Sequence, residues 1–124
     1  MKKKVTVEVK WMKSPQDHDY AAAENYLSLA YSEEDSEFYA NKLRTSNMTS
    51  FKAKDIFRAS GLSLLGVSNS HVKANIKKIN AGTAMSPILL VRGQNDKVII
   101  ADGYHRMCSV YTFNEDISIP CKIV

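Results

Sequence analysis

Hydrophobic and polar residues alternate near the start of the chain. Val5, Val7, Val9 and Trp11 stand at every second position, and the residues between them are polar. A period of two places alternate side chains on opposite faces of a β-strand. The pattern therefore predicts a half-buried strand, which Pro15 ends.

From residue 17 to residue 82 the apolar positions recur every three or four residues, which predicts helices. Residues that accept hydrogen bonds from free backbone N–H groups begin them, and glycine closes two of them. The first is capped by Asp17 or Asp19 and turns Ala23, Tyr26, Leu27, Ala30 and Tyr31 inward; the second is capped by Ser32 and turns Phe38, Tyr39, Lys42 and Leu43 inward. The third is capped by Thr49 or Ser50 and closed by Gly61, and the fourth is capped within residues 68–70 and ends at Gly82.

The last third of the chain changes period again. Apolar runs at residues 88–91 and 98–101, separated by turn residues at 93–96, predict an antiparallel hairpin. A helix from Tyr104 to about Thr112 and a final strand at residues 119–124 follow. The fold class is therefore α+β: one domain, residues 1–124, with a small mixed β-sheet and an N-terminal helical elaboration.

The charge of the chain is unevenly distributed. Its net charge is +4. Residues 14–41 carry seven acids and no lysine or arginine, whereas residues 42–82 carry eight bases against Asp55 alone. The basic segment could attract a nucleotide or nucleic acid, and pairing of acidic and basic helices on a solvated surface is the simpler explanation.

Composition narrows the location of the protein. No apolar run approaches the roughly 18 residues of a membrane span, and the basic start lacks the apolar core of a signal peptide. Cys108 and Cys121 lack metal-type spacing, so we expect reduced, buried thiols. We therefore expect a cytoplasmic protein that does not bind membranes.

The stretch from Asp102 to Arg106 joins the buried strand to the last helix. His105 and Arg106 fall in the first helical turn, although a helix N-terminus disfavours cations. Free N–H groups, a glycine (Gly103) that lets a ligand approach, and these two basic side chains together predict a site for an anion such as phosphate. Pairing of Arg106 with Asp102 is the structural alternative. Asp102 could order the loop, ligate Mg²⁺, or act as a base.

This stretch, Asp102-Gly103-Tyr104-His105-Arg106, together with the strands at residues 86–91 and 119–124, resembles the ParB/sulfiredoxin superfamily. The chain is also similar to small bacterial ParB-like nuclease-domain proteins. The resemblance implies that Gly103, Tyr104, His105 and Arg106 bind the phosphates of ATP or CTP with Mg²⁺. Tyr104 stands where sulfiredoxins need a cysteine, so sulfiredoxin chemistry is not expected. His105 stands where ParB proteins carry a second arginine, so ParB-like clamping on DNA is not expected either.

The sequence thus predicts a nucleotide-phosphate-binding domain, with Asp102, His105 and Arg106 as candidate catalytic residues for phosphoryl transfer. The alternative is a non-catalytic nucleic-acid-binding or regulatory module, and nuclease activity ranks third. Asp17, His18 and Asp19 cap a helix, or form a second polar site if they fold back onto the loop at 102–106. No spacing predicts a metal site within the chain itself. We expect His71 to be structural, and the helix lysines to be solvated.

Overall fold

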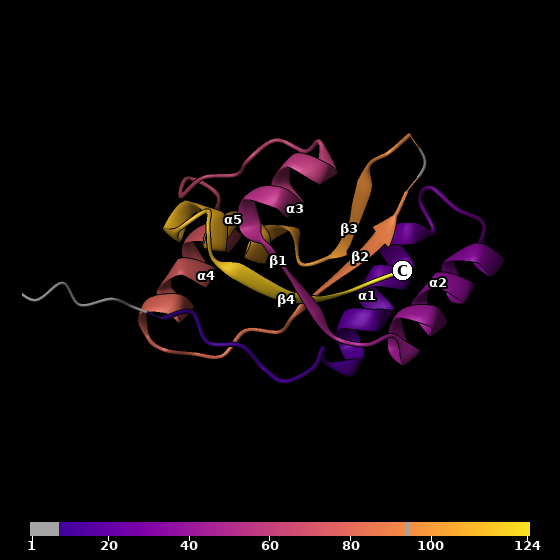
Figure 1. Ribbon diagram of the computed structural model, residues 1–124, viewed down its shortest axis with the longest axis horizontal. Coiled ribbons are helices and arrows are strands. Elements are labelled where there is room, and N and C mark those ends of the chain that lie inside the picture. Colours follow the sequence, from indigo (N-terminus) through magenta and orange to yellow (C-terminus); the bar gives the residue numbers. More distant parts are fainter. Residues whose placement is uncertain (1–7, 94) are drawn as a thin grey trace, which may run out of the picture.

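The computed structural model describes residues 8–93 and 95–124, and within them five helices surround one four-stranded sheet (Figure 1). The helices are α1 (Asp17–Leu27), α2 (Glu33–Thr45), α3 (Ala53–Ser60), α4 (Ser70–Asn80) and α5 (Tyr104–Phe113). The strands are β1 (Thr49–Lys52), β2 (Ile88–Arg92), β3 (Val98–Asp102) and β4 (Ser118–Ile123). The predicted α+β class with a mixed sheet is confirmed.

The sheet has the order β1-β4-β2-β3. The hairpin β2–β3 is antiparallel, as predicted, and its turn holds Asn95 and Asp96 at positive φ, a conformation that these two residue types tolerate. The last strand, β4, runs parallel to β2 and antiparallel to β1. Strand β4 therefore lies between β1 and β2 in the sheet.

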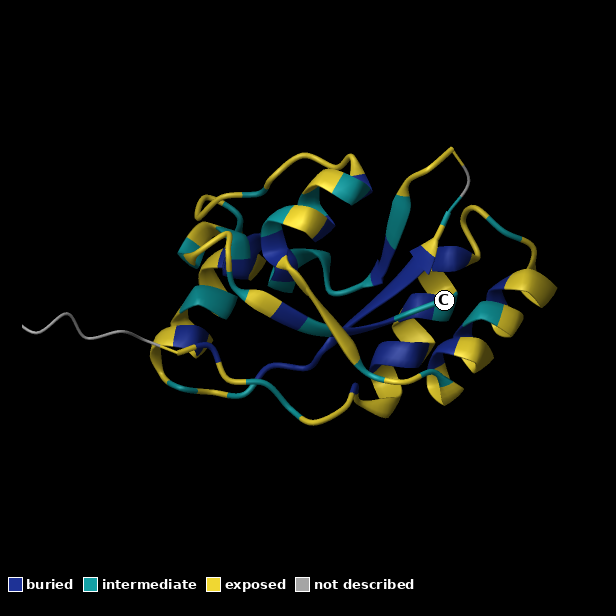
Figure 2. Ribbon diagram, in the orientation of Figure 1, coloured by how far each residue is buried: buried dark blue, intermediate teal, exposed yellow. Residues whose placement is uncertain are grey.

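The sheet is covered on both faces, and strand β2 shows why. Ile88 and Leu90 point to one face and pack with α3, α4 and α5, whereas Leu89 and Val91 point to the other and pack with α1 and α2. Figure 2 shows this strand as a buried band between the two helical layers. A continuous apolar run is what a strand buried on both faces requires.

One predicted helix start is wrong. Thr49 and Ser50 do not cap the third helix; they lie in β1, paired with Cys121 and Pro120 of β4. Tertiary pairing prevails over local capping here, because β-branched and aromatic residues fit a strand that finds a partner. The helix begins only at Ala53 and, as predicted, ends at Gly61 with positive φ.

The helical layer of α1 and α2 differs from prediction in detail. Gln16 rather than an aspartate is the N-cap of α1, and Asp19 completes its capping box as the third helical residue. Tyr26 and Phe38, predicted to point inward, are 48% and 55% exposed, because Tyr20 and Ala40 are buried on these helices instead. The predicted caps Ser32 and Asn69 are confirmed.

The predicted first strand lies partly outside the described residues, since Val5 and Val7 fall there. The described part contributes a single parallel bridge, in which Trp11 pairs with Met85, and it buries Val9. Its described residues therefore run beside the segment that leads into β2 without joining the four-stranded sheet. That position brings the start of α1 close to Ser86.

Lys122 ties β4 to α2. It is 7% exposed, its Nζ donates to the Arg44 carbonyl at 3.1 Å in the last turn of α2, and it lies 5.3 Å from the centre of the Tyr20 ring. We expect Lys122→Met to destabilise the fold by about 1–2 kcal/mol, because the carbonyl loses its donor and the helix C-terminus loses its cation. Chemical denaturation measures this, and Lys73→Met on the exposed face of α4 is the control. Equal stability of the two variants would contradict the assignment.

Candidate anion-binding site

The turn between β3 and α5 is built around Gly103. Its φ is +106°, and a Cβ placed there would lie 2.3 Å from Cγ2 of Ile88, a fully buried residue of β2. The sequence suggested that this glycine leaves room for a ligand. The structure instead fills the Cβ direction with Ile88, so the turn and its packing against β2 require glycine.

Arg106 and Asp102 form an ion pair across this turn, as the structural alternative predicted. Arg106 Nη2 lies 2.8 Å from Asp102 Oδ2, and the two side chains are only 19% and 16% exposed. The same nitrogen donates to the Pro87 carbonyl at 3.4 Å, whereas the buried Nε has no hydrogen-bond partner among the described residues. The pair fixes the position of the guanidinium and leaves part of its donor capacity unused.

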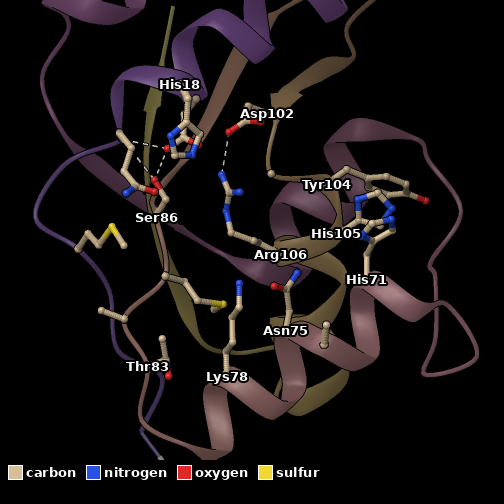
Figure 3. Close-up of a pocket in the computed structure, with 17 residues that line it drawn as sticks. His18, His71, Asn75, Lys78, Thr83, Ser86, Asp102, Tyr104, His105 and Arg106 are labelled. Atoms are coloured by element: carbon tan, nitrogen blue, oxygen red, sulfur yellow. Dashed lines mark hydrogen bonds and ion pairs between the residues drawn. The ribbon is translucent and has the colours of Figure 1, made fainter.

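A cavity of about 490 Å³ opens beside this ion pair. Four parts of the chain line it: the segment before α1 with the first turn of that helix, one face of α4, the segment before β2, and residues 102–106. Figure 3 shows Lys78 and Asn75 extending from α4 toward the guanidinium of Arg106, with Asp102 beyond it. Segments that are far apart in sequence thus present cations, amides and carboxylates to one space.

The start of α1 brings a second carboxylate to this cavity. Asp19 is 3% exposed, accepts a hydrogen bond from the Gln16 backbone N–H at 2.8 Å, and accepts another from the Ser86 hydroxyl. His18 Nε2 lies 3.5 Å from the same carboxylate. His18 and Asp19 therefore fold back onto the loop at 102–106, whereas Asp17 does not line the cavity. Asp19 therefore both completes the capping box of α1 and faces the cavity.

Two histidines form the opposite wall. The rings of His71 and His105 are 4.8 Å apart, centre to centre (Figure 3). Burial, His71 and Arg106 all lower the pKa of His105 below its ordinary 6.5. His71, which the sequence suggested was only structural, lies on the cavity together with Asn75 and Lys78. Their i, i+4, i+7 spacing puts the three side chains on one face of α4, next to the face that buries Val72 and Ile79, and this spacing was the signal that the sequence offered.

Burial also shifts the ionisation of Asp102. Burial is the largest cause that raises the pKa of this carboxyl above 3.8, whereas the Arg106 guanidinium lowers it by less than burial and Asp19 together raise it. Asp102 is therefore easier to protonate than an ordinary aspartate and is already engaged by Arg106, which suits ordering the loop better than acting as a base.

The thiols offer no nucleophile to this site. Cys108 and Cys121 are free and buried, as predicted. Burial raises the pKa of Cys108, and it raises that of Cys121 to about 11. A buried thiol with a raised pKa is inert.

Over residues 8–93 and 95–124, no three His, Cys, Asp or Glu side chains are grouped so that they could hold a metal ion, and no helix is long and apolar enough to cross a membrane. Comparison with known proteins gives no match among family models, curated proteins or solved structures.

Proposed function

We propose that this cavity binds the phosphate groups of a nucleotide. The observation that carries the proposal is Arg106: its guanidinium is held at 2.8 Å by Asp102 in the first turn of α5 and faces a polar cavity. A positioned guanidinium beside a helix N-terminus is a strong donor set for phosphate oxygens. Gly103, Tyr104 and His105 supply the turn and the neighbouring backbone N–H groups.

The charges of the cavity lining favour an anion by a narrow margin. Lys78 and Arg106 balance Asp19 and Asp102 when the histidines are neutral. The N-terminus of α5 adds roughly half a positive charge, and protonation of His105 or of Asp102 would add more. Binding of an anion is therefore coupled to the uptake of a proton by His105 or Asp102.

The sequence resemblance to the ParB/sulfiredoxin superfamily supports the same location, because it implies that the segment from Gly103 to Arg106 binds phosphates. We include that fold type in the proposal, with ATP or CTP as the ligand and the cytoplasm as the location. Mg²⁺ would arrive with the nucleotide and offset the charge of its phosphates. Asp102 faces the cavity, but Arg106 already engages it, so most of the oxygen ligands would come from the phosphates themselves.

Phosphoryl transfer is the reaction that would follow binding. Arg106 and His105 would stabilise charge on the transferred group, because both lie at the N-terminus of α5. Asp19 is the carboxylate that would orient an acceptor hydroxyl, since it already accepts a hydrogen bond from the Ser86 hydroxyl in the same cavity.

A thermal-shift titration with ATP, ADP, CTP and GTP, each with and without Mg²⁺, tests the proposal. A nucleotide at a hundred times its Kd stabilises the fold by about 2.7 kcal/mol, which corresponds to several degrees in a domain of this size. Release of ADP and inorganic phosphate from ATP in the same samples tests transfer of the phosphoryl group to water. A melting temperature that no nucleotide changes would refute the proposal.

We expect His105 to make binding stronger at low pH. A bound phosphate raises the lowered pKa of His105, so binding takes up a proton as the pH falls toward and below 6.5. Nucleotide phosphates also gain a proton near pH 6, so the informative quantity is the affinity ratio between the wild type and His105→Gln. Calorimetry should give a larger ratio at pH 6 than at pH 8. A ratio independent of pH would remove His105 from the site.

Binding of nucleic acid is the alternative function. Lys73, Lys77 and Lys78 are exposed on α4, and Lys78 also lines the cavity. Binding through such lysines falls steeply with salt, since each phosphate contact releases counterions. Affinity for a single-stranded oligonucleotide that exceeds the affinity for ATP and is lost between 50 and 200 mM salt would favour this alternative.

A further inference from the structure

A second cavity adjoins the first across the segment from Asp102 to His105. Its volume is about 460 Å³, and these four consecutive residues line both cavities. The rest of its lining comes from α1, β3 and the segment after α3, and most of it is apolar: Ala22, Tyr26, Leu62, Ile100 and Ala101. A polar cavity and an apolar cavity thus lie on two sides of one loop.

We propose that the apolar cavity holds the base of a nucleotide whose phosphates occupy the polar cavity. This inference rests on the proposed function and restricts the ligand class: a nucleoside phosphate is selected over inorganic phosphates and small phosphate esters. The shared lining carries the argument, because a ligand that fits both cavities joins an apolar group to an anionic one, as a nucleotide does.

The side chains around the second cavity suit an aromatic ring. Tyr26 and Leu62 are 48% and 39% exposed, so each presents apolar surface to the cavity instead of to the core. The Tyr104 hydroxyl donates to the Ser63 carbonyl, which fixes its ring beside the cavity, and Figure 3 shows this ring turned away from Arg106. Any nucleotide base can stack on a tyrosine ring, because every base has a π-face.

The chemistry of the lining also affects which base is bound. The side chains of Ala22, Leu62, Ile100 and Ala101 carry no hydrogen-bonding group. A base recognised by stacking and apolar contact is read with little discrimination at its edges. ATP is therefore a suitable probe, since its purine offers the larger stacking surface.

The test compares ATP with inorganic tripolyphosphate, which carries the phosphates without a base. Calorimetry measures both ligands on the wild type, Tyr26→Ala, Leu62→Ala and Phe38→Ala. Phe38 is an exposed aromatic residue of α2 outside both cavities, and it serves as the control. All three replaced side chains are exposed, so the variants should fold.

We expect Tyr26→Ala to weaken ATP binding about tenfold and to leave tripolyphosphate binding unchanged. Leu62→Ala should weaken ATP binding several-fold, and Phe38→Ala should change neither ligand. Equal effects of Tyr26→Ala on ATP and on tripolyphosphate, or no effect on either, would overturn the base site and leave the phosphate site intact. Failure of the wild type to bind either ligand would overturn the proposed function, and the base site with it.

Discussion

Gly103→Ala should lower the melting temperature by about 10–20 °C or prevent folding. The new Cβ would lie 2.3 Å from Cγ2 and 2.8 Å from Cβ of Ile88, distances at which the backbone or Ile88 must move. Ile88 is a fully buried residue of β2 that packs against α3, α4 and α5, so neither its side chain nor the backbone of the turn can move freely. Overpacking of a core costs about 1–3 kcal/mol, and a non-glycine residue at φ +106° costs about as much again.

Gly66→Ala is the matched control. A Cβ at Gly66 meets no atom within 4 Å, and its φ lies outside the range that strains other residues. Circular dichroism melting of the two variants against the wild type decides the point. If Gly103→Ala melts like Gly66→Ala, the packing of the turn against Ile88 is wrong, and so is the position of α5 relative to β2.

The second large effect is on binding. We expect Arg106→Ala to weaken ATP binding about 100-fold, because the ion pair with Asp102 holds this guanidinium in place at the helix N-terminus and its loss removes charge-assisted hydrogen bonds to phosphate. Isothermal titration calorimetry at fixed salt measures this. Asp102 would lose its partner in this variant, and its raised pKa allows it to take up a proton instead of staying buried and charged.

Two further variants separate binding from folding. Arg58→Ala removes an arginine that is 77% exposed and makes only a 3.9 Å pair with Asp55, so it should leave ATP affinity unchanged. Asp102→Asn removes a negative charge from the cavity and keeps an amide oxygen that can accept the hydrogen bond from Arg106, so the guanidinium stays in place and the variant should bind ATP at least as well as the wild type. An Arg106→Ala protein that folds and binds ATP with wild-type affinity would contradict the role given to Arg106.

Local patterns predicted the C-terminal third of the fold well. The runs at residues 88–91 and 98–101 are long enough and apolar enough to specify buried strands, and the turn residues between them specify a hairpin. The segment at residues 49–52 was predicted poorly. It could cap a helix or form a strand, and only the distant residues of β4 decide in favour of a strand.

The site was predicted in part for the same reason. The turn from Asp102 to Arg106 is local, so its geometry and the pairing of its two charged ends could be anticipated. The positions of Asp19 and Ser86 depend on how α1 packs against the segment before β2, which no spacing in the sequence encodes. The sequence showed that His71 and Lys78 lie on one face of α4, but it did not show that this face lines the cavity.

The most direct test locates the nucleotide by nuclear magnetic resonance. The backbone N–H groups at the start of α5 precede the first helical bond, which Met107 makes to the Gly103 carbonyl, and they have no hydrogen-bond acceptor among the described residues, so they can bind phosphate. In an ATP titration followed by ¹H–¹⁵N correlation spectra, the largest shift changes should fall on the amides of residues 103–106. Changes confined to the exposed lysines of α4, or no changes at saturating ATP, would contradict the proposal that this cavity is a nucleotide-phosphate site.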